Sequence, residues 1–172
     1  KIFCCGRNDR YGVLGLTHKR KIDSFVYLKD LSLLCCNVNN IYLNASRIFV
    51  QNIHDEIYGS GSNKYYELGT ENTMIDPSLP GNDDEGVAKF ERINPVRDEV
   101  IKLISNGTDN FYHTFFCSMN DEIYCCGCNY RGQFGNGSKS GQAYKTMPIR
   151  IDNTFITQDG DHVADIQCGC RH

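Results

Sequence analysis

The sequence predicts an all-β protein made of repeated antiparallel sheets that are arranged as blades. Three observations support this prediction. A glycine- and asparagine-rich phrase occurs three times, a second phrase recurs between its copies, and the runs between them are rich in aromatic and β-branched residues. We therefore expect one repeat array over residues 1–172, with approximate units at 1–55, 56–121 and 122–172.

The first phrase is anchored on a glycine, at Gly6, Gly61 and Gly127. An isoleucine stands four residues before each anchor and an aromatic residue three before it. An asparagine follows two residues after it, and a Leu-Gly or Phe-Gly pair closes the phrase. Glycine tolerates positive φ and close approach of another chain, and asparagine bonds its own backbone, so the phrase predicts a strand that ends in a tight turn.

The second phrase precedes the first in each period, with internal offsets of 3, 5, 6 and 9 residues. We place its copies at the segments that begin with Leu31, Ile101 and Val163. Two phrases that recur in one order indicate architecture rather than a single site. The residues to which we assign this structural role are Gly6, Asn8, Gly15, Gly61, Asn63, Gly69, Gly127, Asn129, Gly132, Gly135, Gly169 and His172.

The segments between the phrases predict strands and hairpins. Residues 41–43, 47–50 and 111–117 are rich in aromatic and β-branched side chains. Short polar turns at 52–55 and 119–121 then lead into the Ile-Tyr strand of the first phrase, which predicts antiparallel pairs. Sheets of this kind leave exposed edges unless the units pack radially around an axis, so blades are the expected arrangement.

Composition and charge limit the function classes. The 172 residues carry a net charge of −3, and this charge disfavours direct nucleic-acid binding by this segment. Apolar runs are far shorter than the roughly 18 residues that span a bilayer, so we expect no membrane partner. The chain lacks an initiating methionine, and we expect it to be a segment of something longer.

Ten cysteines leave two interpretations open. An even count in a small secreted chain suggests a disulfide framework, and sequons at Asn44, Asn106 and Asn136 agree with secretion. The pairs Cys4-Cys5 and Cys125-Cys126, however, lie in stretches that favour strands, where a thiol serves as a small buried apolar side chain. We favour reduced core thiols and a cytoplasmic or nuclear compartment.

The phrase I-Y-x-x-G-x-N-x-x-G-Q-[LF]-G-x-G stands intact at Ile123 to Gly137. Pro148 follows it, and V-x-x-I-x-C-G-x-x-H stands at Val163 to His172. In these motifs the chain resembles the regulator of chromosome condensation repeat family, as a divergent member. Tyr66 stands where the third copy has Gly132, and small residues replace the aromatic residue that usually precedes the anchor glycine.

The resemblance implies a seven-bladed β-propeller whose blades are four-stranded sheets. Three periods are too few to close such a ring, so we expect an open arc of a larger propeller. Repeats are stabilised largely by their neighbours. The remaining blades, or a partner protein, would therefore be needed to cover the open apolar faces.

The sequence supports a phosphate, zinc or nucleophile site less well than a structural role for the same residues. The glycine-rich stretch 127–141 lacks the Gly-Lys-Ser/Thr ending of a phosphate cradle. The thiols of Cys125, Cys128, Cys168 and Cys170, together with His172, could be drawn as a zinc site, but we favour structural filling. His113 and Cys117 would lie about 13 Å apart along one strand, too far for a nucleophile pair. We expect no cofactor, no metal and no catalytic residue.

The acidic trio Asp83, Asp84 and Glu85 lies in the longest of the three connections. A solvated charge run is the ordinary reading, yet enlarged loops on rigid scaffolds are common contact sites, so we treat this loop as a candidate partner-binding site. The basic trio at 19–21 is a weaker candidate.

Two functions remain open. The first is a non-catalytic platform for protein–protein interaction. The second, which the family resemblance implies, is guanine nucleotide exchange on a Ran-like small GTPase. Exchange requires only a surface that binds the nucleotide-free GTPase better than the loaded one.

Overall fold

The computed structural model describes residues 1–8, 12–16, 21–29, 31, 37–44, 46–70, 86–93, 96, 100–107, 113–137, 147–152, 161–169 and 172. The chain forms two compact units. The N-terminal unit contains residues 1–64 and 72–93, and the C-terminal unit contains residues 65–71 and 94–172. Each unit is described by itself below.

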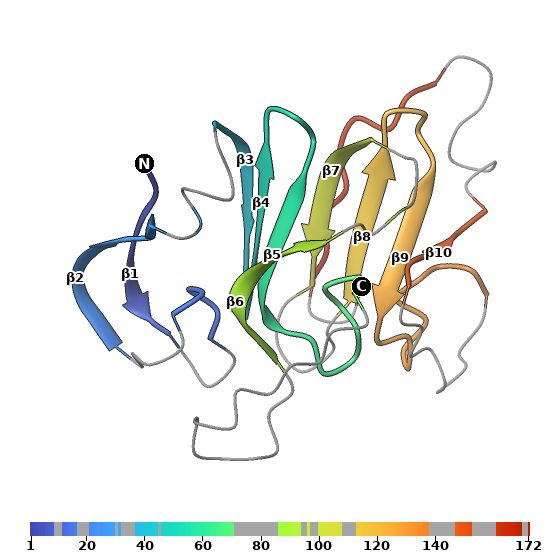
Figure 1. Ribbon diagram of the computed structural model, residues 1–172. Coiled ribbons are helices and arrows are strands. Elements are labelled where there is room, and N and C mark those ends of the chain that lie inside the picture. Colours follow the sequence, from blue (N-terminus) through green and yellow to red (C-terminus); the bar gives the residue numbers. More distant parts are fainter. Residues whose placement is uncertain are drawn as a thin grey trace. The chain divides into compact units, whose positions relative to one another are not determined.

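The N-terminal unit contains two antiparallel sheets (Figure 1). The smaller sheet pairs β1 (Phe3–Arg7) with β2 (Lys21–Tyr27). The larger sheet has the order β3-β4-β5-β6, and each strand pairs with its neighbour in the sequence. Its strands are β3 (Val38–Leu43), β4 (Arg47–Asn52), β5 (Ile57–Ser62) and β6 (Gly86–Ile93).

The C-terminal unit contains a second four-stranded antiparallel sheet, in the order β10-β9-β8-β7. Its strands are β7 (Ile101–Asn106), β8 (His113–Ser118), β9 (Ile123–Gly127) and β10 (Ile149–Arg150). The predicted hairpins are present, because β4 pairs with β5 and β8 pairs with β9 through the two polar turns.

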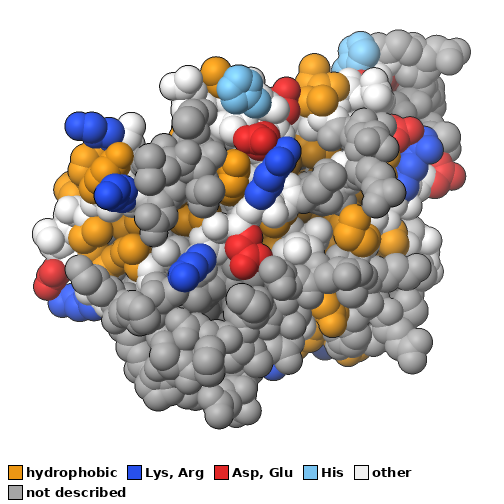
Figure 2. Space-filling model, viewed as in Figure 1, with side chains coloured by type: hydrophobic (Ala, Val, Ile, Leu, Met, Phe, Trp, Pro, Cys, Tyr) orange, Lys and Arg blue, Asp and Glu red, His pale blue; other side chains and the backbone are white. Residues whose placement is uncertain are grey.

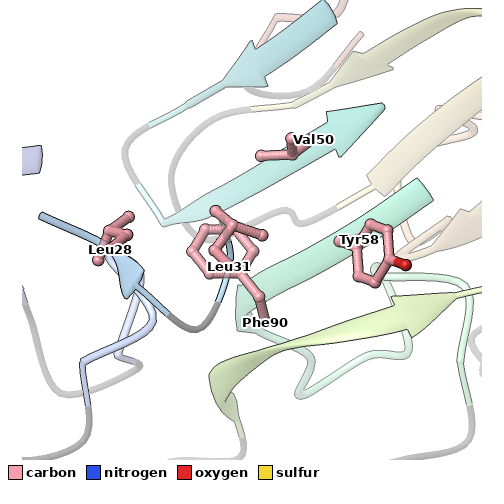
Figure 3. Packing of buried hydrophobic residues seen from close by; sticks show 5 residues of the cluster. All are labelled: Leu28, Leu31, Val50, Tyr58 and Phe90. Carbon is pink, nitrogen blue, oxygen red and sulfur yellow. The ribbon is translucent and has the colours of Figure 1, made fainter. Parts of the chain in front are cut away.

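A hydrophobic core lies beside the larger sheet of the N-terminal unit (Figure 3). Leu28 and Leu31, which follow β2, pack with Val50 of β4, Tyr58 of β5 and Phe90 of β6. Partly buried side chains of the small sheet extend this core. The C-terminal unit has its own core, formed by Cys117, Ile123, Cys125, Phe134 and Ile151. Cysteine here serves as a small apolar residue.

The architecture confirms the predicted fold class. Four sequential antiparallel strands that form one sheet are the blade of a β-propeller. The sheets do not coincide with the sequence periods, because the first period contains β1 and β2 of one sheet and β3 and β4 of the next. The unit boundaries inferred from the sequence therefore describe the repeat of the motif and not the limits of a sheet.

Candidate functional site: the repeated turn and the blade strands

Two of the anchor glycines face a buried residue of the neighbouring strand, and at Gly61 the two strands come unusually close together. Gly61 pairs with Arg47 of β4, and Gly127 pairs with His113 of β8. A Cβ on Gly61 would lie 2.1 Å from the carbonyl oxygen of Ser46, and its φ is 111°. Gly127 has a φ of 96°. A side chain at Gly61 is therefore excluded both by space and by backbone conformation.

The asparagine of the first phrase fixes the turn that follows the strand. The side-chain oxygen of Asn8 accepts a hydrogen bond from the Leu14 amide at 2.8 Å. That of Asn129 accepts one from the Phe134 amide at 2.9 Å. The first copy has one more residue between these positions and forms the same bond. Asn63, at the equivalent position, is fully buried.

The closing glycines adopt left-handed conformations. Gly15, Gly69 and Gly135 have φ angles of 68°, 73° and 65°. Each of their amides donates to the carbonyl three residues earlier, at 2.7, 3.0 and 3.0 Å. The accepting residue also has a positive φ in every copy, and its identity is Gly12, Tyr66 or Gly132. Tyr66 therefore adopts a left-handed conformation, with a φ of 61°, at a position where the other two copies have glycine.

The turn of one period is hydrogen-bonded to the sheet of the next. Within the C-terminal unit, the carbonyl of Glu67 accepts a bond from Thr114 Oγ1 of β8 at 2.6 Å and one from Cys126 Sγ of β9 at 3.6 Å. Within the N-terminal unit, the carbonyl of Gly12 accepts one from Ser60 Oγ of β5 at 3.0 Å. Ser60 and Cys126 both directly precede an anchor glycine, so a small donor at this position ties successive periods together.

The repeated Asp-Glu-Ile-Tyr segment places an ion pair between the start of a central strand and the neighbouring outer strand in each large sheet. Glu56 lies 3.0 Å from Arg92 and accepts a bond from the Tyr58 hydroxyl at 3.2 Å. In the other sheet, the corresponding distances from Glu122 are 2.8 Å to Arg150 and 2.6 Å to the Tyr124 hydroxyl. The pKa of Glu56 is lowered, chiefly by a hydrogen bond from Asn52. These acids therefore bind partners within their own sheet.

The register corrects our alignment of the second phrase. In the C-terminal unit the phrase begins at β7, where Ile104 pairs with Phe116. The equivalent pair in the other large sheet is Ile41 and Val50, so the phrase there begins at Val38 and not at Leu31. Leu31 is a core residue between the sheets of the N-terminal unit. Val38, Ile41, Leu43, Asn44 and Arg47 have the offsets that we assigned to the segment at Leu31.

In all three copies a main-chain hydrogen bond closes the end of this phrase, across three residues in two copies and across six in the copy at Gly107. The amide of Asn44 donates to the carbonyl of Arg47 at 3.0 Å. The amide of Gly107 donates to that of His113 at 2.8 Å, and the amide of Gly169 donates to that of His172 at 2.6 Å. Arg47 and His113 are fully buried. The sequence alignment missed Arg47 and His113 as members of the motif and placed Asn40 and Asn110 there instead.

Close contact explains the glycine of this turn. A Cβ on Gly107 would lie 2.4 Å from the imidazole of His113, and one on Gly169 would lie 2.4 Å from the imidazole of His172. The two histidines therefore cover glycines in the same way. His172 is exposed, in contrast to His113.

The described cysteines are free thiols, and four of them, Cys117, Cys125, Cys126 and Cys128, are buried. Burial raises the pKa of Cys117, Cys125 and Cys128, so these thiols stay protonated and are poor nucleophiles and metal ligands. Within the described part of the chain, no group of three or more candidate ligands is close enough to hold a metal ion. Cys170, one of the thiols considered for zinc, lies outside the described residues.

The candidate partner loop, Asp83, Asp84 and Glu85, also lies outside the described residues. The same is true of Lys19 and Arg20, whereas Lys21 begins β2. Across the described ranges, no helix has the length and apolar character needed to cross a membrane.

Asp121 joins three segments of the C-terminal unit. Its carboxylate accepts a hydrogen bond from Lys102 of β7, and it lies 2.7 Å from Nδ1 of His162. It also accepts a bond from the Val163 amide at 2.9 Å. These bonds, led by the one from Lys102, hold the pKa of Asp121 well below its ordinary value. The carboxylate therefore attaches the start of the last second-phrase copy to the β8–β9 turn.

Sheets and turns of this kind define the chain as a set of β-propeller blades. Residues 120–172 match the model of the regulator of chromosome condensation (RCC1) repeat. The whole chain is 29% identical over 175 residues to the human probable E3 ubiquitin-protein ligase HERC4 and spans 14% of that protein. The rat protein of that name is 27% identical over the same share. The match to this repeat is thus confined to residues 120–172, while the similarity to the HERC4 proteins extends over the whole chain.

Solved propellers have the same fold. Prp20p from Saccharomyces cerevisiae superposes with a TM-score of 0.67 at 18% identity, over 94% of this chain and 36% of Prp20p. Human WBSCR16 superposes with a TM-score of 0.63 at 17% identity, over 97% of this chain and 37% of that protein. The chain thus spans about a third of the length of these propellers.

Replacing Tyr66 by glycine should raise the free energy of unfolding by about 1 kcal/mol, because a side chain in the left-handed conformation costs energy that glycine avoids. The measurement is urea unfolding followed by circular dichroism. Tyr65→Gly is the matched control, and we expect it to destabilise the chain. Equal destabilisation by both substitutions would contradict the strain argument.

Stability of the Asp121 contact should depend on pH in the acid range. A pKa that is lowered in the folded state contributes stability above the unfolded value, near 3.9, and this stability is lost as the pH falls below about 4. Hydrogen exchange at the Val163 amide should therefore accelerate on going from pH 6 to pH 3, after correction for intrinsic rates.

Asp121→Asn should remove this pH dependence while leaving the positive φ acceptable, because asparagine tolerates that conformation. Asp23→Asn, on the exposed side of β2, is the control and should leave the Val163 profile unchanged. A pH profile at Val163 that survives in Asp121→Asn would show that another group is responsible.

Proposed function

We propose that this chain is a non-catalytic platform for protein–protein interaction, built from regulator of chromosome condensation repeats. The observation that supports this proposal best is the use of the recurrent polar residues. Asn8, Asn129 and Glu56 form hydrogen bonds within the turns and sheets that contain them. Their recurrence is therefore explained by the architecture of the blades and requires no reaction.

The state of the thiols agrees with this proposal. Burial raises the pKa of the thiols of Cys117, Cys125 and Cys128. A protonated thiol in an apolar core reacts slowly. These residues stabilise the blades by filling space, and we propose a cytoplasmic or nuclear compartment where they stay reduced.

Two of the solved propeller structures are described with protein partners. Prp20p is described with its binding properties to Gsp1p and histones, and yeast RCC1 (Prp20) is described bound to Kap60. We propose a protein partner for this chain as well, possessing a basic surface that complements the acidic connection at Asp83, Asp84 and Glu85. The ligase name of the HERC4 relatives belongs to whole proteins, of which this chain spans 14%.

Neutralising the loop should weaken binding to a basic partner. For Asp83→Asn, Asp84→Asn and Glu85→Gln combined, we expect about a tenfold loss of affinity for core histones at low salt, and a smaller loss at high salt because exposed charges are screened. Interferometry on the purified chain measures the affinity at low salt and at high salt. Asp23→Asn controls for the loss of charge elsewhere, and unchanged affinity in the triple variant would exclude this loop as the contact.

The alternative function is guanine nucleotide exchange on a Ran-like small GTPase. The fold of Prp20p, described as binding Gsp1p, is the observation that favours it. An exchange factor accelerates release by binding the nucleotide-free GTPase more tightly than the loaded form, so it needs no nucleophile.

Release of a fluorescent guanine nucleotide from Gsp1p and from other small GTPases tests the alternative. The platform proposal predicts release rates within about twofold of the spontaneous rate at saturating chain, because equal affinity for both forms shifts no equilibrium. Prp20p is the positive control. Acceleration of several-fold or more by this chain would overturn the platform proposal in favour of exchange.

A further inference from the structure

Two asparagines of the chain, Asn106 and Asn136, are followed directly by glycine. In such a dipeptide the main-chain nitrogen of the glycine can attack the side-chain amide carbon of the asparagine, because glycine has no Cβ that hinders the approach. The sequence makes the two dipeptides equally susceptible to this attack. Their surroundings in the C-terminal unit are different, and this difference separates a reactive asparagine from a protected one.

The main chain of the first dipeptide is enclosed. Asn106 is the last residue of β7 and pairs with Thr114 of β8. The amide of Gly107 donates a hydrogen bond to the carbonyl of His113 at 2.8 Å, and Gly107 is buried. A Cβ on Gly107 would lie 2.4 Å from the imidazole of His113. This hydrogen bond must break, and the end of the hairpin must open, before the nitrogen of Gly107 can attack.

The main chain of the second dipeptide is open. Asn136 and Gly137 follow the closing glycine of the first phrase, and both residues are exposed and lie outside the strands. Gly137 has a φ of 75°, and a Cβ on Gly137 would meet no described atom within 4 Å. Among the described residues, no acceptor is bonded to the amide of Gly137. The nitrogen of Gly137 therefore reaches the side chain of Asn136 without the loss of a strand or of a main-chain hydrogen bond.

We propose that Asn136 is a site of spontaneous deamidation and isoaspartate formation, and that the fold protects Asn106 from the same reaction. The nitrogen of Gly137 attacks Cγ of Asn136. The N–Cγ bond forms, the Cγ–Nδ2 bond breaks, and ammonia leaves with the proton of the Gly137 amide. Water, the sole co-reactant, then opens the cyclic imide. Hydrolysis at Cγ gives aspartate, and hydrolysis at the main-chain carbonyl carbon gives isoaspartate.

Both products change the turn that closes the third copy of the first phrase. Each places a new carboxylate beside Gly135, and the isoaspartate also lengthens the main chain by one methylene group. A single carboxylate is a large local change on a surface where acidic and basic side chains are interspersed, as on the face shown in Figure 2. The isoaspartyl carboxylate is the group that protein L-isoaspartyl methyltransferases methylate. The proposal concerns the chemistry of one turn and does not rest on the proposed function.

Ageing of the full 172-residue chain in water enriched in heavy oxygen tests the proposal. The chain is kept at neutral pH, digested in ordinary water under mildly acidic conditions, and read by peptide mass spectrometry. In the folded chain, the peptide with Asn136 should gain heavy oxygen about tenfold faster or more than the peptide with Asn106, because Gly107 reacts only after local opening. In urea that unfolds the chain, the two rates should agree within about threefold, because the protecting hairpin is lost.

Variants of the chain locate the site independently. Asn136→Gln should remove the label from its own peptide and leave the Asn106 peptide unchanged, because the longer side chain closes an imide ring far more slowly. Methylation by a protein L-isoaspartyl methyltransferase should be several-fold lower in the aged Asn136→Gln chain than in the aged native chain. Asn120→Gln changes an exposed turn asparagine that is followed by aspartate, and it should alter neither readout. Circular dichroism verifies that each variant retains its sheets.

Three results would overturn the proposal. The first is equal labelling of the two peptides in the folded chain. The second is a difference that persists unchanged in urea, because local sequence and not the fold would then protect Asn106. The third is undiminished methylation of the aged Asn136→Gln chain, which would place the isoaspartate elsewhere.

Discussion

The close approach of two backbones at Gly61 is the constraint on which the larger sheet of the N-terminal unit depends. Gly61 lies so near Ser46 and Arg47 that a single methyl group would collide with main-chain atoms. Main chain cannot move aside as the end of a flexible side chain can. The glycine therefore sets the path of the whole hairpin, and the large buried residue across from it is held at the point of contact.

This constraint propagates through the turn that follows. The strand leaves the glycine, the asparagine closes a turn on its own backbone, and the left-handed residues return the chain toward the next sheet. There the turn accepts hydrogen bonds from Thr114 and Cys126, which stand in the central strands of the C-terminal sheet. Each period thus completes its neighbour, which is the usual basis of stability in repeat proteins. A blade taken alone would lose these bonds.

Sequence reasoning identified the elements that depend on glycine and missed those that depend on register. The first phrase was readable because its anchor glycine, its asparagine and its closing glycine recur in all three copies. The second phrase was misplaced because Leu31 and Cys36 resemble its apolar positions, whereas the true copy at Val38 ends in Arg47 rather than in histidine. A usable signal existed, because the same number of residues separates Arg47 from Gly61 and His113 from Gly127. Cross-strand pairing fixes the number of residues between the buried residue and the anchor glycine. A motif that is written as residue types does not contain this spacing.

The replacement of histidine by arginine at one blade shows how far the architecture constrains chemistry. Both residues are fully buried across from a glycine, and the carbonyl of each accepts a hydrogen bond from an amide of the second phrase. The site requires a side chain that fills the space beside the glycine, and both the guanidinium group of arginine and the imidazole of histidine do so. Positions of this kind are occupied by the packing of the blade itself. The connections between the phrases differ in length from one period to the next, and loops on a rigid scaffold tolerate substitution better than the strands that they join.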